Sequence, residues 1–345
     1  MPPAPPVPVA INDLAAQQQG NGVQLSFSLP GRTISGDRLA EPPAAEIFRA
    51  SGAAGTPENK SFKLVYTIPG ALADVYAAQG KIVFLDPISP DELRAHPGAL
   101  YAYRVRTRAS RQKDSADSNT VAVKVFPVAA KIPSLEARVT QSAIELSWPA
   151  ATSKSLSGET VAGYHVYRGE LDPSAPALPN PNDLSQAKWK SPPILLAPAQ
   201  TNSYRDTLFD FGKTYVYQVR SIVIAEGNPI ESDNSAPAIV APRDIFPPEA
   251  PRNVVVAVVP MPDGSTSVEL SWSINVEPDL AGYRVYRSET AGQRGAPLQS
   301  QLLLSPAYRD LDAHSGHKYW YTITALDRAG NESNPSAPAP ADLQR

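Results

Sequence analysis

The chain carries an internal repeat, and this repeat limits its possible folds more than any other feature. Five segments recur in the same order in two stretches: VTQSAIELSW (139–148) and DGSTSVELSW (263–272), AGYHVYR (162–168) and AGYRVYR (281–287), SYRD (203–206) and AYRD (307–310), KTYVYQV (213–219) and KYWYTI (318–323), ESDNSAPA (231–238) and ESNPSAPA (332–339). Five matches in one order indicate one module used twice. A more divergent third copy contributes GVQLSF (22–27), EIFR (46–49), FLD (84–86) and LYAYRV (100–105).

The repeated segments alternate between apolar and polar residues. Val268, Leu270 and Trp272 share one side of a segment, whereas Glu269 and Ser271 take the other. Period-two patterning in short segments with turn signals between them predicts half-buried strands of a sandwich or barrel. The 37 prolines agree with this, since proline continues neither a helix nor a central strand. We therefore predict an all-β chain.

The blocks resemble fibronectin type III domains. That family has a Trp at the end of the second strand, Gly-Tyr-x-Val-Tyr-Arg in the third and Tyr-x-Tyr-x-Val in the sixth. The resemblance implies three tandem immunoglobulin-like β-sandwiches in an elongated array. It also implies tyrosine corners at Tyr101, Tyr215 and Tyr319, each hydroxyl bonding back to the backbone of the preceding loop. The first copy departs from the pattern, because Ala45 replaces the tyrosine found at positions 164 and 283.

The predicted organisation is a proline-rich tether at 1–9 followed by modules at 10–126, 133–242 and 250–340. Proline-rich joints stiffen toward extended geometry, which favours a semi-rigid rod. The second module has a Pro- and Asn-rich insertion at 169–193, which is either functional or a spacer. The first module has an insertion of similar length, and we expect an added strand at FKLVYTI (62–68).

The start of the sequence resembles the tether that follows the lipid-bearing cysteine of bacterial surface lipoproteins with such domains. This resemblance implies an extracytoplasmic location, periplasmic or on the cell surface, and a lipid anchor that this sequence lacks. The alternative is that Met1 is the native start. The net charge of −3 gives no support for nucleic-acid binding, and no stretch of 18 apolar residues predicts a membrane helix.

Catalytic chemistry has little support in the sequence. There are no cysteines, only four histidines, and no nucleotide-binding, zinc-protease or nucleophile-elbow motif. Asp310, Asp312 and His314 imitate the start of a calcium loop, but Ser315 stands where glycine is required and Tyr321 where a bidentate glutamate is required. We therefore expect no enzyme, no metal site and no cofactor.

Two candidate binding surfaces remain. Arg104, Arg106 and Arg108 alternate along one strand and should line an outward face, which is either a site for a polyanion or an ordinary solvated strand face. In the third module, Tyr286 and Trp320 should face outward from neighbouring strands. Such an aromatic patch suits sugar rings or a protein partner. The alternative is a cross-strand pair that stabilises the sheet, or a patch that a neighbouring module covers.

These observations favour a non-catalytic binding or scaffold protein, a rod for protein interaction, adhesion or spacing, with a protein or cell-surface glycan as partner. The alternative is an accessory carbohydrate-binding component of a polysaccharide-processing system. A hydrolase would need paired carboxylates in a cleft, whereas the acids here fall mainly in turns, such as Asp310, Asp312 and Asp327.

Overall fold

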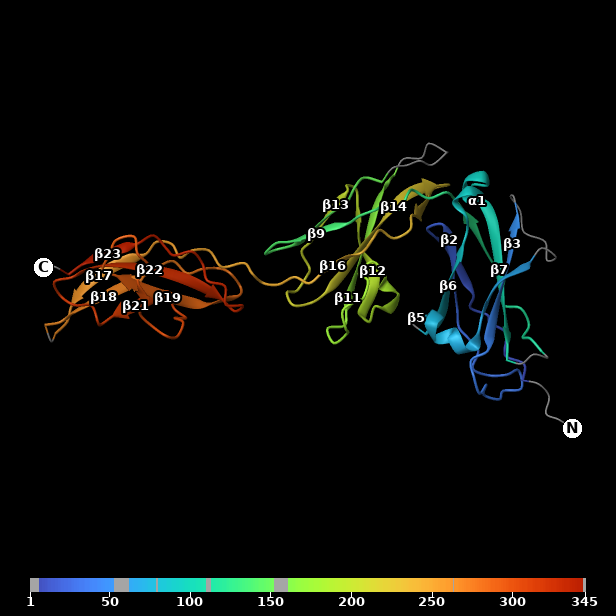
Figure 1. Ribbon diagram of the computed structural model, residues 1–345, viewed down its shortest axis with the longest axis horizontal. Coiled ribbons are helices and arrows are strands. Elements are labelled where there is room, and N and C mark those ends of the chain that lie inside the picture. The colour runs from blue at the N-terminus through green and yellow to red at the C-terminus, as the bar shows by residue number, and fades with distance from the viewer. Residues whose placement is uncertain are drawn as a thin grey trace. The chain divides into compact units, whose positions relative to one another are not determined.

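The computed structural model describes residues 6–52, 62–78, 80–109, 113–151, 161–262 and 264–343. These residues form six antiparallel sheets, which enclose three separate hydrophobic cores (Figure 1). The chain divides into two compact units, Met1–Pro242 with the first two sandwiches and Arg243–Arg345 with the third. The prediction of an all-β fold built from tandem sandwiches is therefore confirmed. None of the described helices has both the length and the apolar character that a membrane span needs.

The first sandwich consists of two four-stranded sheets. Their strand orders are β1-β2-β6-β5 and β4-β3-β7-β8. The strands are β1 (Ala15–Gln19), β2 (Gly22–Phe27), β3 (Ala44–Gly52), β4 (Lys63–Ile68), β5 (Ala77–Ala78), β6 (Lys81–Pro87), β7 (Ala99–Arg108) and β8 (Val121–Val125). Strand β4 is the added strand expected at FKLVYTI. A 3-10 helix, η2 (Gly70–Tyr76), and a six-residue helix, α1 (Pro90–Ala95), connect strands.

The second sandwich has sheet orders β13-β10-β9 and β12-β11-β14-β15, and β16 also pairs with β14. The strands are β9 (Glu136–Val139), β10 (Ile144–Ser147), β11 (Gly163–Leu171), β12 (Trp189–Ala199), β13 (Ser203–Asp206), β14 (Tyr215–Ala225), β15 (Asn228–Glu231) and β16 (Ala238–Val240). Part of the 169–193 insertion lengthens the β11–β12 hairpin, with Leu171 opposite Trp189. The rest is a loop that contains η3 (Leu184–Gln186).

The third sandwich, orange to red in Figure 1, has sheet orders β17-β18-β21 and β20-β19-β22-β23. The strands are β17 (Val255–Pro260), β18 (Thr266–Ser271), β19 (Leu280–Ser288), β20 (Ala296–Pro297), β21 (Ala307–Asp310), β22 (Lys318–Asp327) and β23 (Ala339–Asp342). Strand β20 has only two residues, because this copy lacks the insertion of the second.

The aromatic residues at the end of the second strand of each copy lie in the cores, as their alternation predicts. Phe27, Trp148 and Trp272 are 0%, 3% and 6% exposed. Trp148 packs edge-on against Tyr164, and Trp272 against Tyr283, with ring centroids 5.3 and 5.2 Å apart. In the first copy, Ala45 occupies the tyrosine position and is buried. The smaller side chain therefore leaves room for other apolar groups in that core.

The three predicted corner tyrosines are buried, but they do not all bond alike. The amides of Asp210 and His314 donate to the hydroxyls of Tyr215 and Tyr319, at 2.9 and 3.4 Å, as a tyrosine corner requires. The Tyr101 hydroxyl instead donates to the Glu92 carboxylate in α1. The prediction that the Tyr101 hydroxyl bonds to the loop backbone is therefore wrong. Helix α1 replaces the loop there, and its Glu92 carboxylate is a stronger acceptor.

An Arg–Asp–Tyr triad crosses the edge of each core. In the third copy, Asp310 is 1% exposed and its Oδ2 accepts bonds from Arg287 and Tyr321 at 2.7 and 2.8 Å. The other two copies use Arg49, Asp86 and Tyr103, and Arg168, Asp206 and Tyr217. Burial, together with the adjacent carboxylate, raises the pKa of Tyr103, Tyr217 and Tyr321, so these hydroxyls remain donors. Each buried charge is thus paired and hydrogen-bonded.

In each copy, two serines bond the backbone of one long strand: β7, β14 or β22. The hydroxyls of Ser336 and Ser333 accept from the buried amides of Ile323 and Ala325 at 3.0 and 2.9 Å. Ser118 and Ser115, and Ser235 and Ser232, do the same in the other copies. These bonds replace a strand partner that the chain does not supply there, and they explain why the Ser-x-x-Ser spacing recurs.

Candidate functional site

The arginine stripe of the first sandwich lies on the outward side of β7, as predicted. Arg104, Arg106 and Arg108 are only partly exposed, and they alternate with the buried residues Val105 and Thr107. Two of these arginines also lie over an aromatic ring. The Arg104 guanidinium lies 4.3 Å from the centre of the Phe62 ring, and that of Arg106 lies 5.2 Å from the Phe48 ring.

Carboxylates pair with the three arginines of this stripe and neutralise their charge. Arg106 pairs with Asp117 at 2.7 Å, Arg108 pairs with Asp114 at 2.6 Å and with Glu46 at 3.1 Å, and Asp117 also lies 3.8 Å from Arg104. The two hydrogen bonds to Asp114 raise the pKa of Arg108 further. Three arginines facing three acids carry no net charge. This favours the solvated strand face over a polyanion site, since a polyanion would have to displace these carboxylates. Lys113 is exposed next to the stripe, and Arg111 lies outside the described residues.

Tyr286 does not form the exposed half of an aromatic patch. Strands β19 and β22 are neighbours, as expected, but Tyr286 is only 6% exposed. Its hydroxyl donates to Glu332 at 2.7 Å, and the Arg294 guanidinium covers its ring at 4.0 Å from the centre. The outward placement predicted from alternation therefore did not give exposure, because long polar side chains cover the ring.

Trp320 is half-buried on the same sheet. It lies opposite Ser288 on one side and Pro340 on the other, and the Lys318 ammonium is 5.5 Å from the centre of its ring. Tyr286 lies opposite Thr322, two positions along the strand, so the two aromatics are diagonal neighbours. This arrangement favours the alternative that the pair stabilises the sheet. Whether either residue binds a partner stays a prediction.

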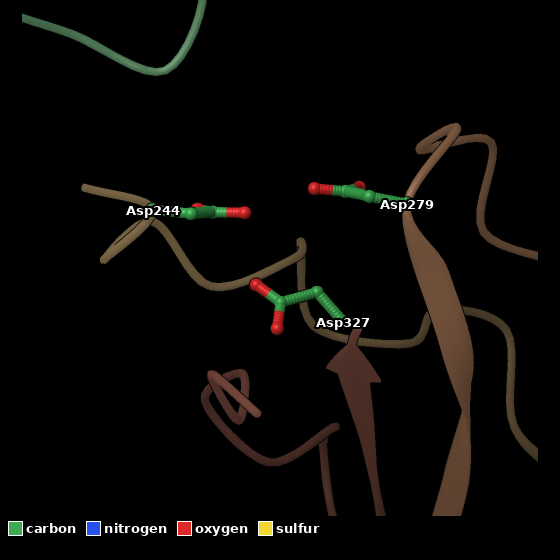
Figure 2. Close-up of side chains that lie close together, drawn as sticks. All are labelled: Asp244, Asp279 and Asp327. Carbon is green, nitrogen blue, oxygen red and sulfur yellow. The ribbon is translucent and has the colours of Figure 1, made fainter. Parts of the chain in front are cut away.

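Three aspartates converge at one end of the third sandwich (Figure 2). Asp244 precedes β17, Asp279 precedes β19, and Asp327 ends β22. One carboxylate oxygen from each lies within 4.8 Å of the others. Asp327 is 3% exposed, and both of its oxygens accept bonds of 2.8 Å from Asn331, one from the backbone amide and one from the side chain. The turn between them requires Gly330, which has a φ of 91°.

No Lys, Arg or His among the described residues forms an ion pair with these three carboxylates. Carboxylate and amide oxygens are the ligands that Ca²⁺ and Mg²⁺ prefer, so Asp244, Asp279, Asp327 and Asn331 are the residues of this sandwich that could hold such a cation. Sequence analysis missed the group because its members come from three segments that only the fold joins. Asp310, by contrast, is engaged by Arg287 and Tyr321.

The sequence of this chain is similar to parts of an exoglucanase and of amylopullulanases. No protein-family model matches the chain. It is 26% identical to exoglucanase B of Cellulomonas fimi over 273 residues, which are 76% of this chain and 22% of that protein. Amylopullulanases of Thermoanaerobacterium thermosulfurigenes and Thermoanaerobacterium saccharolyticum are 37% and 34% identical over 100 and 94 residues, 5% and 7% of their lengths.

The two amylopullulanase matches cover 29% and 27% of this chain. The chain spans less than a quarter of the length of each of the three relatives. Among solved structures, the chicken CNTN1 FN1–FN3 domains match over 98% of this chain and 100% of that chain, at 14% identity and a TM-score of 0.29. The assignment of fibronectin type III-like sandwiches therefore rests on the sheet orders and on the repeated core residues.

Proposed function

We propose that the chain is a non-catalytic, extracytoplasmic scaffold of a polysaccharide-processing system, which holds or spaces other components. The observation that carries this proposal is how the buried acids are used. Asp86, Asp206 and Asp310 are each bound by an arginine and a tyrosine, and both Asp327 oxygens are bound by Asn331. Glycoside hydrolysis needs two carboxyl groups that reach a substrate in a cleft, and these four are committed to holding the fold.

The relatives support the polysaccharide context. An exoglucanase and two amylopullulanases, which share only short parts of their length with this chain, carry stretches that resemble it. An accessory module, present beside different catalytic activities, accounts for a likeness to enzymes with such different names. Extracytoplasmic location and a lipid anchor remain part of the proposal, and the first residues of the natural precursor test the anchor directly.

The test of the catalytic part is a reducing-end assay of the purified chain on cellulose, starch and pullulan. We expect no release above buffer with any of them, and steady release from one polysaccharide would contradict the proposal. A second candidate role, direct carbohydrate binding, is favoured by the same relatives. A glycan array separates the two roles, because a pure spacer retains no glycan.

A further inference from the structure

A polar cleft lies where the first two sandwiches meet within the Met1–Pro242 unit. Its volume is about 740 Å³. The first sandwich supplies β1 and β8, with Gln17, Gln18, Gln19 and Lys124, and the second supplies residues of β11, β14 and the β14–β15 hairpin. Small-molecule sites commonly have volumes of roughly 300–1,000 Å³ and often form where two domains meet.

Direct contacts hold the two walls together. The Asn21 side chain donates to Asp233 at 2.9 Å, and Lys124 pairs with Glu226 at 2.7 Å. Gly20 lies so close to Asp233 that a Cβ on it would come within 1.8 Å of the aspartate Oδ1. The cleft is therefore formed in the free protein and need not be assembled by a ligand.

The charged side chains that line the cleft neutralise one another. Lys124 pairs with Glu226, and Arg220 pairs with Glu231 at 2.6 Å. His165 and the Tyr167 hydroxyl also contact Glu231. Two acids paired with two basic side chains leave no net charge for attracting an anion or a cation, and these contacts would have to break before any of the four could pair with an ionic ligand.

The remaining polar groups of the lining are amides. Gln17, Gln18, Gln19 and Asn228 each carry both a donor and an acceptor. Gln18 is used inside the first sandwich, where it bonds both backbone groups of Phe126. Within the part of the chain that the structure describes, the side chain of Gln19 makes no hydrogen bond, and that of Asn228 makes only one, of 3.3 Å, to the Glu226 carbonyl. A side-chain amide both donates and accepts hydrogen bonds, and so does a hydroxyl group, so the two can pair in either direction.

From the uncharged lining and its free amides, we propose that this cleft binds a neutral oligosaccharide. The inference rests on the proposed role in a polysaccharide-processing system and adds to it a binding site and a ligand class. Gln19 from the first sandwich and Asn228 from the second would bond sugar hydroxyls from opposite walls. The Arg220 guanidinium covers the Tyr167 ring at 4.3 Å from its centre, so hydrogen bonding, more than stacking on that covered face, provides the specificity.

The test is isothermal titration of the full chain with cellohexaose, maltohexaose and, as the charged comparison, an oligogalacturonate. We expect binding of at least one neutral oligosaccharide and none of the charged one. Gln19→Ala and Asn228→Ala should each weaken the affinity about fivefold or more, as the loss of one hydrogen bond predicts. Gln186→Ala, an exposed glutamine in η3 outside the cleft, is the matched control and should bind like the parent.

Three results would overturn the cleft proposal: no binding of either neutral oligosaccharide at millimolar concentration, tighter binding of the oligogalacturonate, or unchanged affinity in both cleft variants. Melting temperatures equal to the parent's show that the variants are folded. The proposed scaffold role fails separately, through hydrolysis in the reducing-end assay, so the two failures are distinguishable.

Discussion

At the scale of single residues, an Arg–Asp–Tyr triad holds one buried aspartate in each sandwich. Asp310 receives the Arg287 guanidinium and the Tyr321 hydroxyl on one oxygen and the Asp312 amide on the other. Arg287 also lies 4.9 Å from the centre of the Tyr319 ring. The aspartate therefore joins β19, β21 and β22 through a guanidinium and a buried hydroxyl.

Asp310→Ala should destabilise the third sandwich by about 3 kcal/mol, because it leaves a guanidinium and a buried hydroxyl without their acceptor. Urea denaturation of the full chain measures this as a shift of one transition. Asp312→Ala removes an exposed aspartate two residues away and is the control, with no measurable shift expected. Equal effects of the two variants would show that the triad adds nothing beyond a surface charge.

The contacts of the Glu332 carboxylate with Tyr286, Thr324, Arg284 and Arg294 predict a loss of stability in acid. Burial alone would raise the pKa of Glu332, but hydrogen bonds from Tyr286 and Thr324 and the charges of Arg294 and Arg284 outweigh it, so the pKa falls below the ordinary 4.5. A carboxyl with a lowered folded-state pKa stabilises the fold above its unfolded pKa, and this contribution disappears as the pH falls through the folded-state value.

We therefore expect the melting temperature of the third sandwich to drop as the pH falls below about 4.5, and Glu332→Gln to flatten part of that drop. Melting curves followed by circular dichroism between pH 6 and pH 3 measure it. Glu289→Gln, an exposed glutamate of the same sandwich, is the control. An identical pH slope in parent and Glu332→Gln would disprove the assignment.

At the scale of elements, period two was sufficient to place strands, because one buried face per strand is a local property of the chain. Val268, Leu270 and Trp272 lie inward as their alternation requires. The same rule failed for Tyr286, because alternation gives the direction of a side chain but not what covers it. Arg294, which covers its ring, comes from a loop whose path only the fold determines. The Ser-x-x-Ser repeat was visible in the sequence, yet its role required knowing that β7, β14 and β22 lack a strand partner at these positions.

The three clustered aspartates come from three separate parts of the third sandwich: before β17, before β19 and at the end of β22. Asp244, Asp279 and Asp327 are 35 or more positions apart along the chain, and only their common location at one end of the sandwich places like charges within 4.8 Å. No spacing rule could have predicted it.

In buffer with a chelator, Asp279→Asn should raise the stability of the third sandwich by about 1 kcal/mol, because it removes a like charge and no described residue donates a hydrogen bond to that carboxylate. Differential scanning calorimetry measures the change, and Asp312→Asn, an exposed aspartate outside the cluster, should leave it unaltered. A lower melting temperature for Asp279→Asn would show that its carboxylate makes a favourable contact instead of a repulsive one.

At the scale of the whole molecule, repetition predicted three sandwiches but could not predict that the first two belong to one compact unit. The contacts between them join residues about one hundred or two hundred positions apart, such as Lys124 with Glu226 and Asn21 with Asp233. These residues lie in turns and strand ends that differ between copies, so comparison of the copies gave no signal. The cleft between the two sandwiches follows from the same contacts.

A substitution at Gly20 tests whether the contact between the first two sandwiches stabilises the Met1–Pro242 unit. Its φ of 55° disfavours a side chain by about 1 kcal/mol, and a Cβ there would also collide with Asp233. Gly20→Ala should therefore destabilise the Met1–Pro242 unit by more than backbone strain explains. In an Asp233→Ala background the collision with the carboxylate is gone, so the same substitution should have a smaller effect. The double-mutant cycle, measured by urea denaturation, isolates this coupling from the strain. Additive effects would mean that the two sandwiches do not touch at Gly20 in solution, and the preformed cleft would lose its physical basis.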